Sequence, residues 1–231
     1  MRRALRLAAI PIVISAGVSL LRLAGELLHW SETWWSPETG GIAVRGFTWV
    51  VGITWLPVLF GPYFAVALWK QGERPPAPAR ALVLALGGLI AAVLGLRLLV
   101  PLVPLPFPQI LLVIWSIMAL AGALQAFGWT ALFRALLSYA LGSRGIVAIV
   151  MFFAMQGNWG THYDFVGMPA PFQMPLWPRF FWLALVPQLV FWSAFTIVLG
   201  SLTGSLAAVY LSSRGRHSQQ RAASGAEFTS A

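Results

Sequence analysis

Residues 7–29 read LAAIPIVISAGVSLLRLAGELLH, an almost unbroken apolar stretch that follows a start rich in arginine. A helix needs about 20 mostly apolar residues to cross the hydrocarbon core of a bilayer, and this stretch supplies them. A basic start before an apolar run is also typical of a signal peptide. Because Arg22 and Glu26 interrupt the run and no small-x-small cleavage site follows, we expect an uncleaved first membrane span.

The composition of the whole chain indicates the same class of protein. Of its 231 residues, 59% are hydrophobic and 9% are charged, whereas soluble domains carry about 25% charged residues. The absence of cysteine excludes disulfides, thiolate metal sites and a cysteine nucleophile. The net charge of +9 does not indicate nucleic-acid binding, because the basic residues punctuate apolar runs instead of gathering among polar neighbours. We therefore predict an all-α integral membrane protein.

Hydropathy and turn signals divide the chain into six predicted transmembrane helices that form one bundle. The predicted spans are about 7–29, 46–69, 81–100, 109–131, 144–164 and 180–211, and a polar tail, 212–231, is expected to be disordered. The fifth span is ambiguous, because its apolar centre at 145–155 is too short to cross alone. Either residues 132–143 are an interfacial connection before a span over 144–164, or this region is re-entrant. We favour the span, since a continuous helix keeps its backbone hydrogen bonds internal.

The distribution of charge provides an independent check of this topology. With both termini in the cytoplasm, the six spans place the whole net charge on the cytoplasmic side, with Arg144 counted at that boundary. The outer half then holds four arginines and four acidic residues. This asymmetry is the positive-inside pattern of membrane proteins. We expect a multi-pass protein of the cell membrane, the inner membrane of a prokaryote.

Polar residues recur along one side of the first span. Ser15, Ser19, Arg22, Glu26 and His29 follow one another at spacings of 4, 3, 4 and 3. At about 100° per residue they fall within one arc of the helix of roughly 80°. A polar stripe in lipid is costly, so it should face neighbouring helices or a wet cavity. The stripe either contributes to a functional site or only joins helices, and both readings stay open.

A second group of polar residues lies between 156 and 164. Asn158 is the only asparagine and Asp164 the only aspartate of the chain, and His162 is close to both. A continuing helix would place Asn158 and His162 on one face, whereas a break at the local glycines would let His162 and Asp164 converge. A histidine here suits proton transfer or metal binding. The alternative is an ordinary polar loop at the membrane interface.

These two groups define the predicted binding site. Arg97 lies at a depth in the outer half comparable to that of Arg22 and Glu26, although it could simply reach the headgroups. We predict that costly polar side chains from separate helices gather around one pocket that opens to the extracytoplasmic side. The predicted binding residues are Arg22, Glu26, His29, Arg97, Asn158, His162 and Asp164.

Three functions fit this pattern, and we favour the first, with the second as the main alternative. The first is binding or transport of a small or amphipathic solute, which predicts a cavity beyond Arg22. The second is a membrane-embedded hydrolase or transferase on a lipid-like substrate, which predicts His162 close to Glu26 or His29. The third is a noncatalytic scaffold subunit, whose polar stripe would face outwards. No catalytic residue, cofactor or metal is assigned, since the zinc, phosphate-loop and nucleophile-elbow motifs are absent. Besides the lipid bilayer, a second copy or another membrane subunit stays open as a partner.

Overall fold

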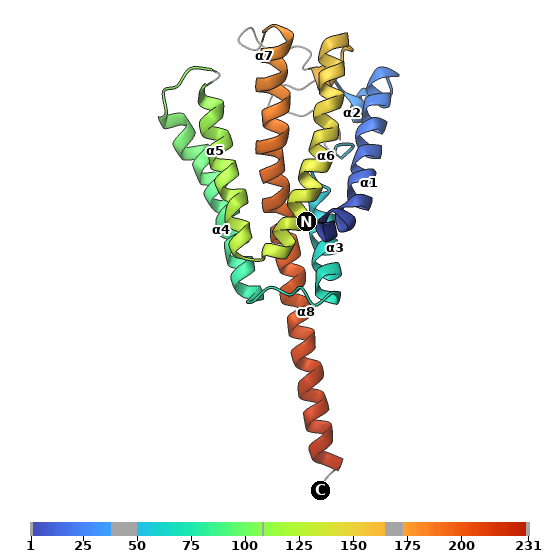
Figure 1. Ribbon diagram of the computed structural model, residues 1–231, viewed down its shortest axis with the longest axis vertical. Coiled ribbons are helices and arrows are strands. Elements are labelled where there is room, and N and C mark those ends of the chain that lie inside the picture. The colour runs from blue at the N-terminus through green and yellow to red at the C-terminus, as the bar shows by residue number, and fades with distance from the viewer. Residues whose placement is uncertain (1, 38–49, 108, 165–172, 230–231) are drawn as a thin grey trace.

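The computed structural model describes residues 2–37, 50–107, 109–164 and 173–229, with side chains described from residue 3 to residue 215 of these ranges. This part of the chain is helical and contains no strand (Figure 1). Its α-helices are α1 (Arg2–Leu27), α2 (Glu32–Trp35), α3 (Pro57–Lys70), α4 (Pro78–Leu94), α5 (Gln109–Leu124), α6 (Thr130–Gly157), α7 (Leu176–Phe180) and α8 (Ser193–Thr229).

Five helical stretches in the described ranges are long and apolar enough to cross a membrane. Four of them correspond to the first, third, fourth and sixth predicted spans, and the other contains α6. They are Arg3–Leu27, Pro78–Leu102, Gln109–Phe127, Thr130–Gly157 and Leu176–Gly215. The stretches after α4 and between α7 and α8 include π-helical turns at Gly95–Leu99, Phe181–Leu185 and Pro187–Trp192. The chain is therefore a helical protein of the kind that lies in membranes.

The second predicted span is not one continuous helix. Residues 46–49 lie outside the described ranges, and residues 50–56 form turns. The helix α3 begins only at Pro57 and has 14 residues, too few to cross a bilayer alone. Proline suits the first turn of a helix because the missing N–H has no intrahelical acceptor there. The glycine and prolines of this segment thus shorten the helix where hydropathy alone predicted a full span.

The predicted boundaries of the fifth span are also wrong. The helix α6 runs over 28 residues, Thr130–Gly157, so the predicted interfacial connection is its first half. Neither proline nor a polar turn interrupts this half, so a continuous helix keeps the backbone hydrogen bonds beyond its first turn internal. Asn158 ends α6 in the left-handed conformation, with φ 47°. One consequence is that Arg144 lies near the middle of α6 instead of at the cytoplasmic boundary.

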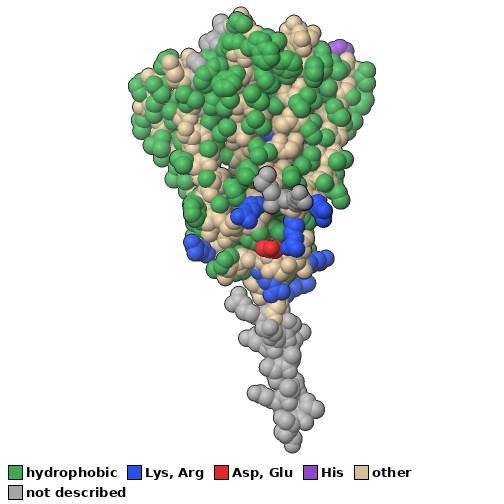
Figure 2. Space-filling model, viewed as in Figure 1, with side chains coloured by type: hydrophobic (Ala, Val, Ile, Leu, Met, Phe, Trp, Pro, Cys, Tyr) green, Lys and Arg blue, Asp and Glu red, His purple; other side chains and the backbone are tan. Residues whose placement is uncertain are grey.

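The helical backbone also continues through most of the predicted disordered tail. The helix α8 reaches Thr229, whereas no regular structure was expected over 212–231. Figure 1 shows this part of α8 extending beyond the other helices. The end of α8 that leaves the bundle lies on the side where Lys and Arg side chains gather, below a broad apolar surface (Figure 2).

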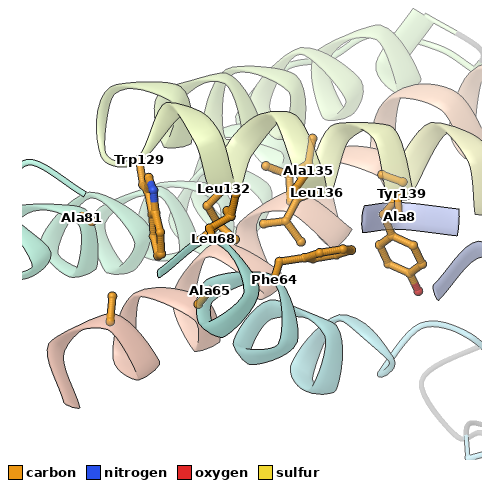
Figure 3. Packing of buried hydrophobic residues seen from close by; sticks show 13 residues of the cluster. Ala8, Phe64, Ala65, Leu68, Ala81, Trp129, Leu132, Ala135, Leu136 and Tyr139 are labelled. Carbon is orange, nitrogen blue, oxygen red and sulfur yellow. The ribbon is translucent and has the colours of Figure 1, made fainter. Parts of the chain in front are cut away.

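The bundle has α8 at its centre and α1 at its edge. The helix α1 lies beside α6 on one side, and the α4–α5 hairpin lies on the opposite side (Figure 1). The largest apolar cluster lies where α3, α6 and α8 meet, around Phe64, Leu132, Leu136 and Tyr139 (Figure 3). These side chains are fully buried and hold the lower half of the bundle together.

Glycines allow α3 and α8 to approach closely. The spacing Gly200-x3-Gly204 is typical of close helix contacts. A Cβ atom added at Gly61 of α3 would collide with the Thr203 hydroxyl and the Gly200 carbonyl oxygen, and one added at Gly204 would lie 2.9 Å from the Gly61 carbonyl oxygen. A similar spacing begins at Gly87 of α4. This glycine makes no close helix contact, because a Cβ atom added there would meet nothing within 4 Å.

We therefore expect opposite effects from two glycine-to-alanine substitutions. Gly61→Ala should lower the free energy of unfolding by about 1–3 kcal/mol, because the new methyl group meets backbone that has no room to move. Gly87→Ala should be neutral or raise it by up to about 1 kcal/mol, since alanine is the better helix former. Thermal unfolding in detergent micelles measures both. Equal effects would contradict a backbone contact at Gly61.

Candidate functional site

The polar stripe of α1 faces the interior of the bundle. Ser15, Ser19 and Glu26 are at most 5% exposed. The Ser15 hydroxyl lies 2.9 Å from the Tyr139 hydroxyl of α6, and the Tyr163 hydroxyl donates to the Ser19 carbonyl oxygen at 2.9 Å. These residues therefore join α1 to α6 and to the segment that follows α6. Ser15, Ser19 and Glu26 therefore do not form the outward-facing seam expected of a scaffold subunit.

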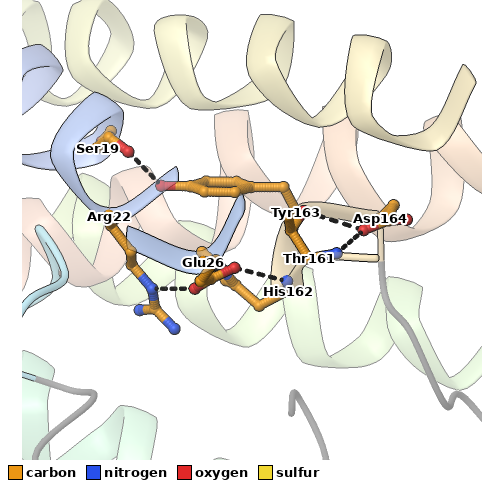
Figure 4. Close-up of polar contacts among 7 residues, drawn as sticks. All are labelled: Ser19, Arg22, Glu26, Thr161, His162, Tyr163 and Asp164. Atoms are coloured by element: carbon orange, nitrogen blue, oxygen red, sulfur yellow. Dashed lines mark hydrogen bonds and ion pairs between the residues drawn. The ribbon is translucent and has the colours of Figure 1, made fainter. Parts of the chain in front are cut away.

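Glu26 is the centre of the stripe. Its carboxylate accepts a hydrogen bond from Arg22 Nε at 2.9 Å and another from the backbone N–H of His162 at 2.9 Å. The His162 Nδ1 atom lies 2.8 Å from Glu26 Oε2. The Glu26 side chain is fully buried, whereas 21% of the His162 side chain is exposed. Figure 4 shows the three side chains meeting between α1 and the turn at 161–164.

This geometry determines which imidazole nitrogen carries the proton. Nδ1 faces a carboxylate that only accepts hydrogen bonds, so the network assigns the proton of a neutral ring to Nδ1. Nε2 is then an acceptor with a lone pair. Burial lowers the pKa of His162 below its usual value, and this effect exceeds the opposing attraction of Glu26. Burial thus favours the neutral ring, and Arg22 provides the positive charge beside Glu26.

Asp164 holds the turn that presents His162. Its carboxylate accepts hydrogen bonds from the backbone N–H of Gly160 at 3.0 Å and of Thr161 at 2.6 Å, and from the Thr161 hydroxyl at 3.0 Å. Gly160 has φ 74°, which glycine adopts without strain. The helix α6 thus ends before His162, which was one of the two expected arrangements. In that arrangement Asp164 was expected to approach His162, but it binds the loop backbone instead of the imidazole.

The other predicted site residues lie apart from this cluster. His29 is exposed at the end of α1, where its backbone N–H donates to the Glu26 carbonyl oxygen at 3.2 Å. Arg97 is exposed in the π-helical turn after α4, on the hairpin opposite α1 (Figure 1). Asn158 is exposed and ends α6 through its backbone. The structure therefore brings together Arg22, Glu26 and His162, with Asp164 behind the turn.

Two aromatic hydroxyls and an arginine were missed by the sequence analysis. Tyr139 and Tyr163 complete the contacts of the stripe, and tyrosines near a membrane boundary look like ordinary belt residues in a sequence. Arg144 is buried, with 4% of its surface exposed. The uninterrupted helical pattern before Arg144 would have identified it, because a continuous helix places this residue away from the membrane boundary.

No metal site is formed by the residues that the structure describes. No group of three His, Asp or Glu residues in these ranges is placed to hold an ion. The cluster can instead exchange a proton at His162 Nε2 and offer the remaining guanidinium N–H groups of Arg22 to a ligand. Its chemistry is that of hydrogen bonding and proton transfer at the end of the bundle.

Replacing Glu26 by glutamine should destabilise the protein strongly. Glu26→Gln leaves Arg22 without its partner and turns an acceptor of His162 into an amide, which costs about 3–5 kcal/mol for a buried pair. The matched control is Glu32→Gln, at an exposed acidic residue of α2, with an expected change within about 0.5 kcal/mol. Thermal unfolding measures both, and a Glu26→Gln protein as stable as the wild type would contradict the buried ion pair.

No family model matches the chain. No curated protein and no solved structure is significantly similar to it.

Proposed function

We propose that this protein binds or transports a small or amphipathic solute at the extracytoplasmic end of a six-pass bundle. The observation that carries the proposal is the meeting of Arg22, Glu26 and His162, which come from segments more than a hundred residues apart. Ionisable groups inside a membrane protein are costly and mark functional sites by default. A purely structural contact between α1 and α6 needs no imidazole with a partly exposed free nitrogen.

The cluster offers a solute a defined set of polar groups. His162 Nε2 accepts a hydrogen bond, and the Arg22 guanidinium, 15% exposed in its side chain, retains donors beyond the one that Glu26 uses. Aromatic residues with exposed rings, Trp30 and Trp159, lie in the segments next to the cluster. Such a combination of few polar groups and apolar surroundings is typical of ligand sites.

The six-pass topology rests on two features. Figure 1 shows α2 and the α4–α5 connection at one end of the bundle and the α3–α4 connection at the other, so the chain passes from end to end between α2 and α4. The basic side chains gather at the latter end (Figure 2), which the positive-inside rule assigns to the cytoplasm. Both termini then lie on the cytoplasmic side of the cell membrane, and the cluster faces away from it.

A membrane-embedded enzyme is the second candidate function. The contact between Glu26 and His162 favours it, because a carboxylate on Nδ1 orients an imidazole so that Nε2 acts as a general base. A lipid-like substrate would reach the exposed edge of the ring from the outer leaflet. The two functions differ in whether the bound molecule is chemically changed.

Cysteine labelling tests the topology without background, since the chain contains no cysteine. We expect a membrane-impermeant maleimide to label Ser31→Cys and Leu105→Cys in intact cells. Gln71→Cys and Thr130→Cys should react only after the membrane is permeabilised. All four positions are exposed. Labelling of Gln71→Cys in intact cells would mean that α3 does not complete a crossing and that the protein has five spans.

Native extraction tests the function of the cluster. The wild type, His162→Asn and His29→Asn are extracted from the expressing cells in polymer-bounded lipid discs, and co-purifying small molecules are compared by mass spectrometry. We expect at least one molecule that the wild type and His29→Asn retain equally. The amount bound to His162→Asn should be about tenfold lower, because the variant lacks the hydrogen bond to Nε2. Asparagine preserves a donor near the position of Nδ1 and removes Nε2, and His29 is the matched exposed histidine.

The same samples separate the two candidate functions. Identical sets of bound molecules in all three proteins would contradict a solute site at His162. An enzyme would also change the lipid inventory of the whole membrane between wild type and His162→Asn at equal expression. A binding or transport protein leaves that inventory unchanged.

A further inference from the structure

Arg144 is a buried cation without a counter-ion in the described part of the protein. It lies near the middle of α6 and is 4% exposed. Its Nε and Nη2 atoms are buried and have no hydrogen-bond partner. The arginines that form ion pairs among the described residues are Arg3, with Glu73, and Arg22, with Glu26. An unpaired guanidinium at this depth is costly to keep, which indicates a ligand.

The two unmet donors have the geometry of a carboxylate receptor. Nε–H and one Nη2–H lie in the guanidinium plane along the same edge and are roughly parallel. This edge matches the two oxygens of a carboxylate, which it binds in a planar, bidentate pair. The guanidinium carbon Cζ lies over the Trp192 ring, 5.2 Å from the ring centroid. This cation–π contact uses none of the N–H donors, so Nε–H and Nη2–H are not consumed by it.

The facing segment adds a second unmet polar group. Trp192 ends the π-helical segment η7 (Pro187–Trp192), which packs against α6. Gln188, one turn earlier, is 8% exposed, and its Oε1 atom is buried without a partner. Its Nε2 donates only to the Met151 sulfur at 3.4 Å. Short π-helical segments occur frequently at functional sites.

We propose that Arg144 binds the carboxylate of an organic acid between α6 and η7. Its Nε and Nη2 atoms hold the two oxygens beside the Trp192 ring, and Gln188 Oε1 is available to a hydroxyl or amine of the same molecule. The proposal goes beyond the proposed function, because it concerns another place in the bundle and other contacts. It names a chemical class that the outer cluster does not specify.

Anion-dependent stability tests this site directly. The purified protein in discs of zwitterionic lipid is unfolded thermally with sodium acetate, benzoate, phosphate or chloride, at constant pH and ionic strength. We expect acetate or benzoate to raise the Tm saturably in the wild type, and phosphate and chloride to raise it less. Arg144→Met should lose the shift. Arg144→Lys should need about tenfold more carboxylate, because an ammonium group keeps the charge and lacks the bidentate edge.

Two controls keep the result specific. Arg97→Met removes an exposed arginine and should keep the full carboxylate shift. His162→Asn should also keep it, so a failure of the outer cluster as a solute site stays distinguishable from a failure here. Without anion, Arg144→Met should have a Tm at or above that of the wild type, since it removes an unpaired buried charge. If this variant does not fold, the comparison of Arg144→Lys with the wild type decides.

Three results would overturn the proposal. The first is an equal carboxylate shift in the wild type and in Arg144→Met or Arg144→Lys. The second is no shift in the wild type with either carboxylate. The third is a larger shift with chloride or phosphate than with both carboxylates, which would assign the site to a different anion.

Discussion

An ionised carboxylate can lie inside an apolar helix bundle only if donors surround its oxygens. At Glu26 this requirement is met by Arg22 from the same helix and by the backbone and side chain of His162. Satisfying it ties the segment after α6 to α1, and this determines which edge of the imidazole faces away from the carboxylate. Tyr163, next to His162, adds its hydrogen bond to Ser19. This end of the bundle is thus organised around one buried charge.

The class of the protein and much of its helical layout follow from the sequence. Apolar runs of sufficient length predict helices near the observed α1, α4, α5 and α8, because hydrocarbon leaves the backbone few alternatives. The spacing of the stripe correctly predicts that Ser15, Ser19 and Glu26 share one face of α1. The contact between Glu26 and His162 was only a hypothesis, because a sequence does not show which distant residues come together in the fold.

The errors have local physical causes. The chain breaks before α3 because Pro57 and its neighbours disfavour a continuous helix in a segment that is apolar enough to predict a full span. Arg144 looks like a boundary residue, since a buried arginine without a partner is too rare to expect. Arg97 was grouped with Arg22 by depth alone, whereas the bundle places them on opposite sides. Asp164 was expected in the site, but a short side chain beside glycines binds the turn itself.

The ion pair between Arg22 and Glu26 is formed within a single helix, and this bears on how the protein is made. Each of these side chains alone makes insertion of a span unfavourable. As neighbours one turn apart on α1, they neutralise each other before α6 has left the ribosome. The part of α1 that follows Arg6 can therefore enter a bilayer without net charge, and His162 joins the carboxylate only when the later helices assemble around it.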